Sequence, residues 1–108
     1  AAAGPVVVVL DLRDRACMEL AAVLQRQHGG LCRFVDFCDD GGVAALLARH
    51  PELPREELCR RGGAAAVLPE GVYLSGLEEH CEMLLYELDY RQRLRPPSAA
   101  FAEGLERE

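Results

Sequence analysis

Thiols are the side chains of this sequence with the clearest capacity for chemistry. The 108 residues include an odd number of cysteines, namely Cys17, Cys32, Cys38, Cys59 and Cys81. No two of them form a CxxC pair, which is the spacing of dithiol redox centres and of many metal sites. Cys17 falls near the start of an expected helix, where the helix N-terminus favours the nucleophilic thiolate. Redox chemistry at Cys17 is therefore one candidate function, and most of the cysteines are expected to be small buried hydrophobic residues.

The histidines and the paired carboxylates give weaker signals. His28, His50 and His80 do not pair with cysteine or aspartate at the spacing of metal ligands, so we expect solvated or capping histidines. Glu78 and Glu79 stand where a helix is expected to begin, a position at which carboxylates stabilise the helix dipole. The glycine pairs are not followed by Lys-Ser or Lys-Thr, and no GxSxG motif occurs. The sequence thus predicts no catalytic residue, no metal site and no cofactor.

Composition limits the partners and the compartment. The net charge of −6 argues against nucleic acid or an anionic membrane as the main partner. No apolar run approaches the length of a membrane span, and the first residues lack the pattern of a signal peptide. The cysteines suggest no disulfide framework. Together with the lack of a signal peptide pattern, they predict a cytoplasmic protein with reduced thiols. The expected partner is another protein. Homo-oligomerisation stays open.

Apolar periodicity predicts alternating strands and helices. A continuous apolar run and an aromatic, β-branched run predict strands over residues 6–10 and 31–38. Helical spacing and proline or glycine stops predict helices over residues 16–27, 43–50 and 55–58. The polar turn at residues 39–42 is expected to supply a helix N-cap.

The stretch AAAVLPEGVYLSG, residues 64–76, predicts a β-hairpin. Its apolar runs, residues 65–68 and 72–75, are too close for a parallel crossover, and Gly71 suits the turn between them. A long helix is expected over residues 77–94, with one apolar face formed by Leu77, Cys81, Leu84, Leu85 and Leu88. We therefore predict one domain over residues 1–97 and a flexible acidic tail over residues 98–108.

This order of elements, β-α-β-α-β-β-α, resembles the thioredoxin fold, and glutaredoxin-like domains in particular. The resemblance is carried by the stretch from Ala66 to Glu79, in which a strand, a turn and a second strand precede an acidic helix start. Ser75 stands where that family has the first of two glycines. The implied fold class is α/β, with a mixed sheet that closes with a hairpin and a helix.

The resemblance also locates the redox centre that active members of this family carry. Their CxxC or CxxS motif lies where the first strand meets the first helix, which falls on Asp14-Arg15-Ala16-Cys17. Asp14 would occupy the attacking position, which an aspartate cannot serve, and Cys17 the resolving position. The family's cis-proline position falls at about Ala64 or Ala65.

The resemblance therefore implies a scaffold without its redox centre, acting as a non-catalytic, adaptor-like protein-interaction domain. A similar case is the group of small adaptor-like members whose glutamate-rich relatives bind Src-homology domains. The candidate contact surface is the pair of segments 11–15 and 75–79, which jointly form the glutathione groove in glutaredoxins. Its candidate residues are Arg13, Arg15, Ser75, Gly76, Glu78 and Glu79.

Two alternatives remain at this point. Residues 67–75 partly echo a strand-to-helix segment of Toll/interleukin-receptor signalling domains, which also begin β-α-β and assemble by homotypic contacts. That family continues with a further strand and helix, whereas Pro96-Pro97 and an acidic segment follow here. The second alternative is a glutathione-linked redox protein that uses Cys17.

Overall fold

The computed structural model describes residues 4–94, which form an α/β fold with a mixed four-stranded sheet. Its elements are β1 (Val6–Leu10), α1 (Arg15–His28), β2 (Cys32–Asp36), α2 (Asp40–Arg49), α3 (Arg55–Leu58), β3 (Ala64–Val67), β4 (Tyr73–Leu74) and α4 (Glu82–Leu94). The predicted domain end at residue 97 and the predicted tail over residues 98–108 lie outside the described residues.

The strand order in the sheet is β2-β1-β3-β4. β1 pairs in parallel with β2, with Val8 beside Phe34, and antiparallel with β3. β3 and β4 pair antiparallel, with Val67 beside Tyr73, so the predicted hairpin is confirmed. The parallel pair is joined by α1, as a crossover connection between parallel strands requires.

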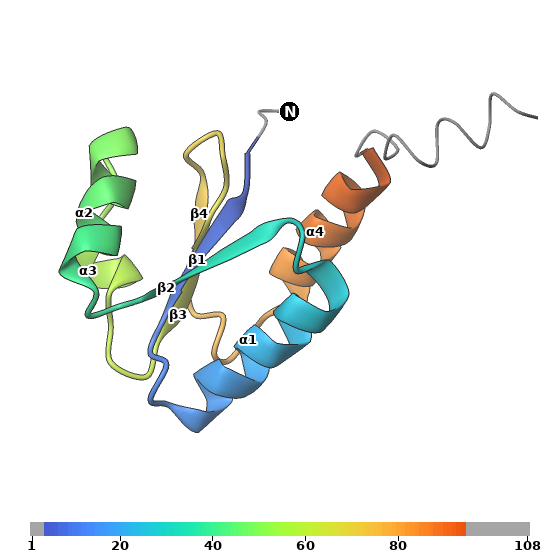
Figure 1. The fold of residues 1–108 in the computed structure, drawn as a ribbon, viewed down its shortest axis with the longest axis horizontal. Helices are drawn as coiled ribbons and strands as arrows, with labels where there is room; N and C mark the ends of the chain where they lie inside the picture. Colours follow the sequence, from blue (N-terminus) through green and yellow to red (C-terminus); the bar gives the residue numbers. More distant parts are fainter. Residues whose placement is uncertain (1–3, 95–108) are drawn as a thin grey trace, which may run out of the picture.

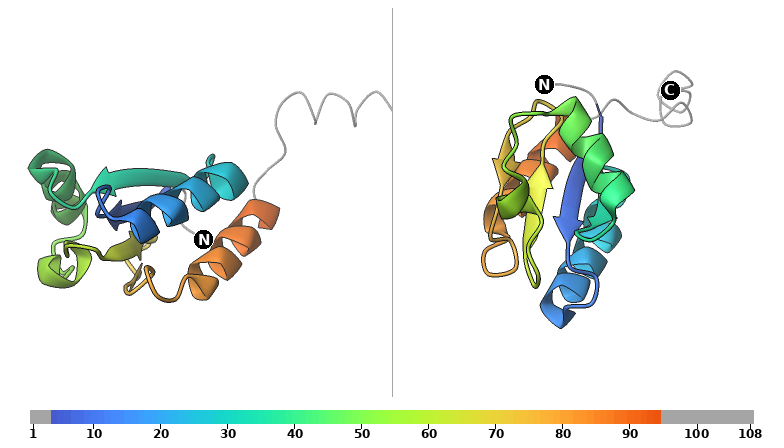
Figure 2. Two further views of the ribbon diagram at one scale, coloured as in Figure 1. Left: turned by 90° about the horizontal axis from the view of Figure 1, so that it is seen from below. Right: turned by 90° about the vertical axis from the view of Figure 1, so that its left-hand side faces the viewer.

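Helices cover both faces of the sheet, with α1 and α4 on one side and α2 and α3 on the other (Figure 1). The left view of Figure 2 shows the same three layers from below. Side chains alternate across a strand, so β1 serves both cores. Val6, Val8 and Leu10 pack with α1 and α4, whereas Val7 and Val9 pack with α2 and α3. Burial on both faces explains why β1 is an uninterrupted apolar run.

The hairpin turn depends on glycine. Gly71 has a φ of +93°, a conformation that other residues rarely adopt, and its N–H donates to the Leu68 carbonyl over 2.9 Å. The Leu68 N–H in turn donates to the Val72 carbonyl over 2.8 Å. These bonds close the connection between β3 and β4.

Three predicted boundaries differ from the structure by two residues or more. The second strand ends at Asp36 rather than at residue 38, because the Asp36 carbonyl accepts a turn bond from the Asp39 N–H. α2 begins three residues earlier than predicted, since the Asp39 carboxylate caps it by accepting the Gly42 N–H. The final helix begins at Glu82 rather than at residue 77.

The late start of α4 has a local cause. Gly76 adopts a φ of +70°, and its carbonyl accepts the N–H groups of Glu79 and His80 in a turn. The Leu77 N–H donates to the Ala64 carbonyl over 2.9 Å, which fastens this turn to β3. Leu77 is nevertheless buried with Leu84 and Leu88 against the sheet, so the predicted apolar face packs as expected, although its first two residues, Leu77 and Cys81, precede the helix.

Candidate functional site

The predicted contact segments lie at one corner of the sheet. Because β1 and β3 run antiparallel, the last residue of β1, Leu10, pairs with the first residue of β3, Ala64. Residues 11–14 follow β1, residues 60–63 precede β3, and residues 75–80 fasten to Ala64. We call these three segments, together with the first turn of α1, the β1–β3 corner.

Asp11 holds the first two segments together. It is 4% exposed, and its carboxylate accepts the backbone N–H of Gly62 over 2.8 Å and that of Arg13 over 3.0 Å. Its own N–H donates to the Gly63 carbonyl over 3.2 Å. The two backbone donors, that of Gly62 first, lower the pKa of the Asp11 carboxyl because they stabilise its charged form. The sequence predicts residues 11–15 as a contact segment but does not single out Asp11 or this role.

Asp14, for which the sequence resemblance predicts the attacking position of a redox motif, is the N-cap of α1. Its extended backbone precedes the helix, and its carboxylate accepts the Cys17 N–H over 3.1 Å. This is the ordinary contribution of an aspartate at a helix start, where the first N–H groups lack partners within the helix. The side chain therefore has a structural task that needs no ligand.

Cys17 is fully buried within the core formed by β1, α1 and α4. Its Sγ donates a hydrogen bond to the Gly63 carbonyl over 3.5 Å. Burial raises the pKa of the Cys17 thiol, and the neighbouring Asp14 carboxylate raises it further. The protonated form is favoured, in contrast to the thiolate that a helix N-terminus would otherwise promote.

Glu78 joins the third segment to the same strand. Its carboxylate accepts the Ala64 N–H over 3.1 Å and a hydrogen bond from the Arg60 guanidinium over 2.7 Å. Since α4 begins four residues later, the expected role of Glu78 at a helix N-terminus was wrong. With Leu77, it satisfies both backbone groups of Ala64 at the start of β3.

The remaining predicted contact residues lie at the surface of this corner. The side chains of Arg13 and Arg15 are 65% and 94% exposed, and Ser75 and Glu79 are exposed as well. Arg13 contacts Asp36 over 3.5 Å, and its Nη1 lies 3.8 Å from Asp11. The corner thus brings the two predicted segments to one backbone stretch, residues 62–64, while Glu78 points inward.

The predicted environment of His28 was wrong. His28 ends α1 in a buried position, and its Nδ1 lies 2.5 Å from the Gln92 Oε1 of α4. It therefore links two helices rather than lying in solvent. Among residues 4–94, no group of three or more His, Cys, Asp and Glu side chains is arranged to hold a metal ion.

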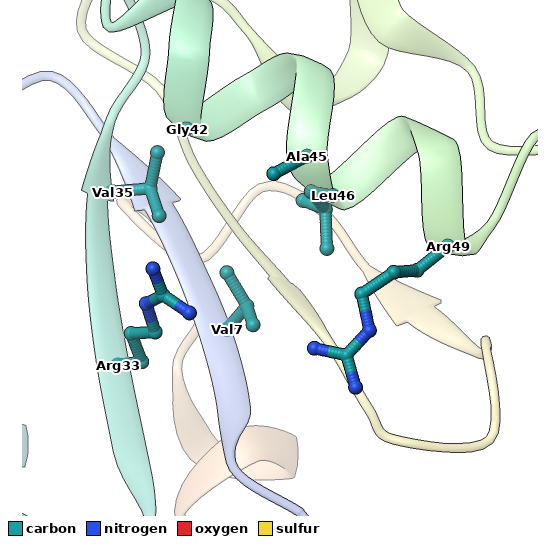
Figure 3. A pocket seen from close by; sticks show the side chains of 7 residues that line it. All are labelled: Val7, Arg33, Val35, Gly42, Ala45, Leu46 and Arg49. Carbon is teal, nitrogen blue, oxygen red and sulfur yellow. The ribbon is translucent and has the colours of Figure 1, made fainter.

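A shallow hollow lies on the other side of the sheet, between β2 and α2 (Figure 3). Its floor includes Val7, Val35 and Leu46, and Arg33 and Arg49 stand at its border. None of the predicted site residues contributes to it. Val7 and Val35 of the hollow belong to the core under α2 and α3, whereas Cys17 of the β1–β3 corner belongs to the core under α1 and α4.

Comparisons with protein-family models, curated proteins and solved structures give no match for this chain. The fold and the site therefore define the class of protein only as an α/β domain with a four-stranded mixed sheet, whose β1–β3 corner is held by hydrogen bonds. Within the described residues, no helix combines the length and apolarity that crossing a membrane requires.

Proposed function

We propose that this chain is a non-catalytic protein-interaction domain, adaptor-like in character, on a thioredoxin-like scaffold. The observation that carries the proposal is the state of the two residues, Asp14 and Cys17, to which the resemblance assigns the redox motif. Asp14 caps α1, and Cys17 is buried and bonded to the Gly63 carbonyl. Both side chains thus maintain the corner and leave its outer surface for contact with a partner.

The arrangement of the sheet supports the scaffold part of the proposal. A parallel β1–β2 pair is followed by the antiparallel β3–β4 hairpin, and α4 closes the fold over the same face as α1. This is the order that the resemblance to glutaredoxin-like domains implies. The short helices α2 and α3 together cover the opposite face, where that fold has one helix between its second and third strands.

The outer surface of the β1–β3 corner supports the interaction part. Arg15, Arg61, Ser75 and Glu79 are exposed there, and Leu12 adds an apolar side chain that is 41% exposed. A mixed polar border around an apolar contact is typical of protein–protein interfaces. The underlying backbone is held by Asp11 and Glu78, so such a surface is rigid before it binds.

A binding comparison of two arginine variants tests this proposal. Arg15→Glu reverses a charge in the corner, and Arg26→Glu makes the same change near the opposite end of α1, where Arg26 is also exposed. Affinity capture with the purified chain, followed by binding measurements on the captured protein, should show a partner lost with Arg15→Glu and kept with Arg26→Glu and Cys17→Ser. Equal binding to all variants would contradict the proposed surface, and disulfide reductase activity of the purified chain would contradict the non-catalytic role.

The two alternatives are less well supported. A redox role for Cys17 conflicts with its burial and with its raised pKa. A Toll/interleukin-receptor-like assembly requires a flavodoxin-like sheet, whereas β3 is antiparallel to β1 and β4. We also propose a cytoplasmic location, because all five cysteines are free thiols.

A further inference from the structure

Helix α4 has a second apolar face, which is exposed among residues 4–94. Leu84 and Leu88 face the core, whereas four other large apolar or aromatic side chains are between 49% and 75% exposed, namely Met83, Tyr86, Tyr90 and Leu94. Their spacing of i, i+3, i+7 and i+11 places them in one row along the helix. We call this row the α4 stripe.

The α4 stripe is the main concentration of exposed apolar surface in the described chain. Within residues 4–94 it supplies four of the seven large hydrophobic side chains that are exposed. Methionine and tyrosine are enriched at protein interfaces, and a contiguous apolar row is the kind of surface that marks a contact site. Figure 2 shows α4, together with α1, on the side of the sheet away from α2 and α3.

We propose that the α4 stripe binds the same stripe of a second copy of this chain, with the two helices antiparallel. A two-fold symmetric contact requires a self-complementary surface. The stripe meets this requirement, because its two pairs share nearly the same midpoint along the helix. The midpoint of Met83 and Leu94 is position 88.5, and that of Tyr86 and Tyr90 is position 88. One two-fold axis near Leu88 therefore places Met83 of one copy opposite Leu94 of the other copy, and Tyr86 of one copy opposite Tyr90 of the other.

The charges beside the stripe select the antiparallel direction. Glu82 and Arg93 lie along the same flank of the stripe, and their midpoint, position 87.5, falls within one residue of the same axis. At about 1.5 Å rise per residue, Glu82 of one copy and Arg93 of the other copy are then separated by only a few ångströms, measured along the helix axis. A parallel two-fold pair would instead turn this flank towards the opposite flank of the other copy, which carries Glu87 and Arg91. Glu82 and Arg93 would then not face each other. The opposed helix dipoles of the antiparallel pair also attract each other.

The size of the stripe sets the expected strength. Four side chains at these exposures bury on the order of 500 Å² per copy, or about 1,000 Å² in total, which is the lower limit of a specific interface. The expected state is accordingly a weak dimer in equilibrium with the monomer at micromolar concentrations and above. This contact does not use the β1–β3 corner, so it stands or falls separately from the proposed function.

Sedimentation velocity of the full chain between about 10 and about 500 µM tests the pairing. The wild type should shift from monomer towards dimer as its concentration rises. Tyr86→Glu should remain monomeric, because it places two charges in the apolar contact, and the exposed Tyr86 can be replaced without loss of folding. Met18→Glu is the matched control, since Met18 is 54% exposed on α1, outside the stripe. Wild type that stays monomeric throughout, or a dimer that survives Tyr86→Glu, would overturn the inference.

A charge-reversal cycle tests the direction. In the antiparallel pair, Glu82→Arg and Arg93→Glu should each weaken dimerisation about 2- to 30-fold, because each removes two exposed ion pairs. The double variant should recover much of the loss, since it restores opposite charges across the axis. In a parallel pair Glu82 and Arg93 do not face each other, so the double variant would show no such recovery. Helix content of each variant, measured by circular dichroism, is the control, because Arg93→Glu also removes the ion pair of Arg93 with Asp89 on the same helix.

Discussion

Leu84 on α4 gives the most direct test of how this fold is held together. Its side chain is fully buried among Val8, Leu24 and Leu88, at the junction of β1, α1 and α4. Leu84→Ala removes three carbon atoms from this core, which at about 0.8 kcal/mol per buried methylene group lowers the free energy of unfolding by about 2.4 kcal/mol. Because the surrounding core relaxes only partly, the residual cavity raises the total loss to about 3–4 kcal/mol.

Urea unfolding measures this loss against a matched control. With a typical slope of about 1–3 kcal/mol per molar urea, the midpoint of Leu84→Ala should fall by about 1–4 M without a change of slope. Leu94→Ala makes the same chemical change on the same helix at a side chain that is 58% exposed, and should cost less than about 1 kcal/mol. Low micromolar protein keeps any pairing of α4 from contributing. If the two variants unfolded at the same urea concentration, the assignment of the buried face of α4 would be refuted.

Three further predictions concern the corner, the thiols and the hairpin. The pKa of Asp11 is lower in the folded than in the unfolded protein, so its contribution to stability is complete above the unfolded pKa of about 3.9 and disappears as the pH falls through the folded value. Urea melts of wild type and Asp11→Asn should therefore differ most near neutral pH, and the difference in free energy of unfolding should shrink in acid. In timed alkylation followed by mass spectrometry, exposed Cys38 should react well before buried Cys17, and equal rates would contradict the burial of Cys17. Gly71→Ala should lower the free energy of unfolding by about 1–2 kcal/mol because of its positive φ, whereas Gly41→Ala, in the first turn of α2, should be neutral or stabilising.

Local sequence patterns were sufficient for the elements whose form depends on near neighbours. The run of valines in β1 predicts a strand covered on both sides, and the short separation of the runs around Gly71 permits only an antiparallel pairing. The apolar row that contains Leu84 and Leu88 likewise predicts which face of α4 packs on the sheet. Each of these inferences needs only the period of a strand or helix, or the geometry of a turn.

The roles of Asp11 and Glu78 depend on contacts that the sequence does not express. Asp11 binds the N–H of Gly62, 51 positions away, and Glu78 binds that of Ala64, 14 positions away. An acidic side chain at the end of a strand usually faces solvent, and one before a helix usually faces the helix start. The N–H groups of Gly62 and Ala64 become available to Asp11 and Glu78 only because β1 and β3 approach each other antiparallel. The α4 stripe, by contrast, could be predicted from the sequence, because Met83, Tyr86, Tyr90 and Leu94 are spaced along one helix face. Only the face that contains Leu84 and Leu88, whose periodicity is stronger, was predicted from the sequence.

The hydrogen bonds of the β1–β3 corner also explain why a cysteine at this helix start need not be reactive. A helix N-terminus lowers a thiol pKa only when the thiolate is near the free N–H groups and water. Here the Asp14 carboxylate accepts the N–H of Cys17, and the Gly63 carbonyl accepts a hydrogen bond from its thiol. A thiolate would lose the second bond, remain close to the Asp14 charge and be buried in the core. The same geometry that stabilises the start of α1 therefore keeps Cys17 protonated, and the chemistry available at this corner is that of its exposed outer surface.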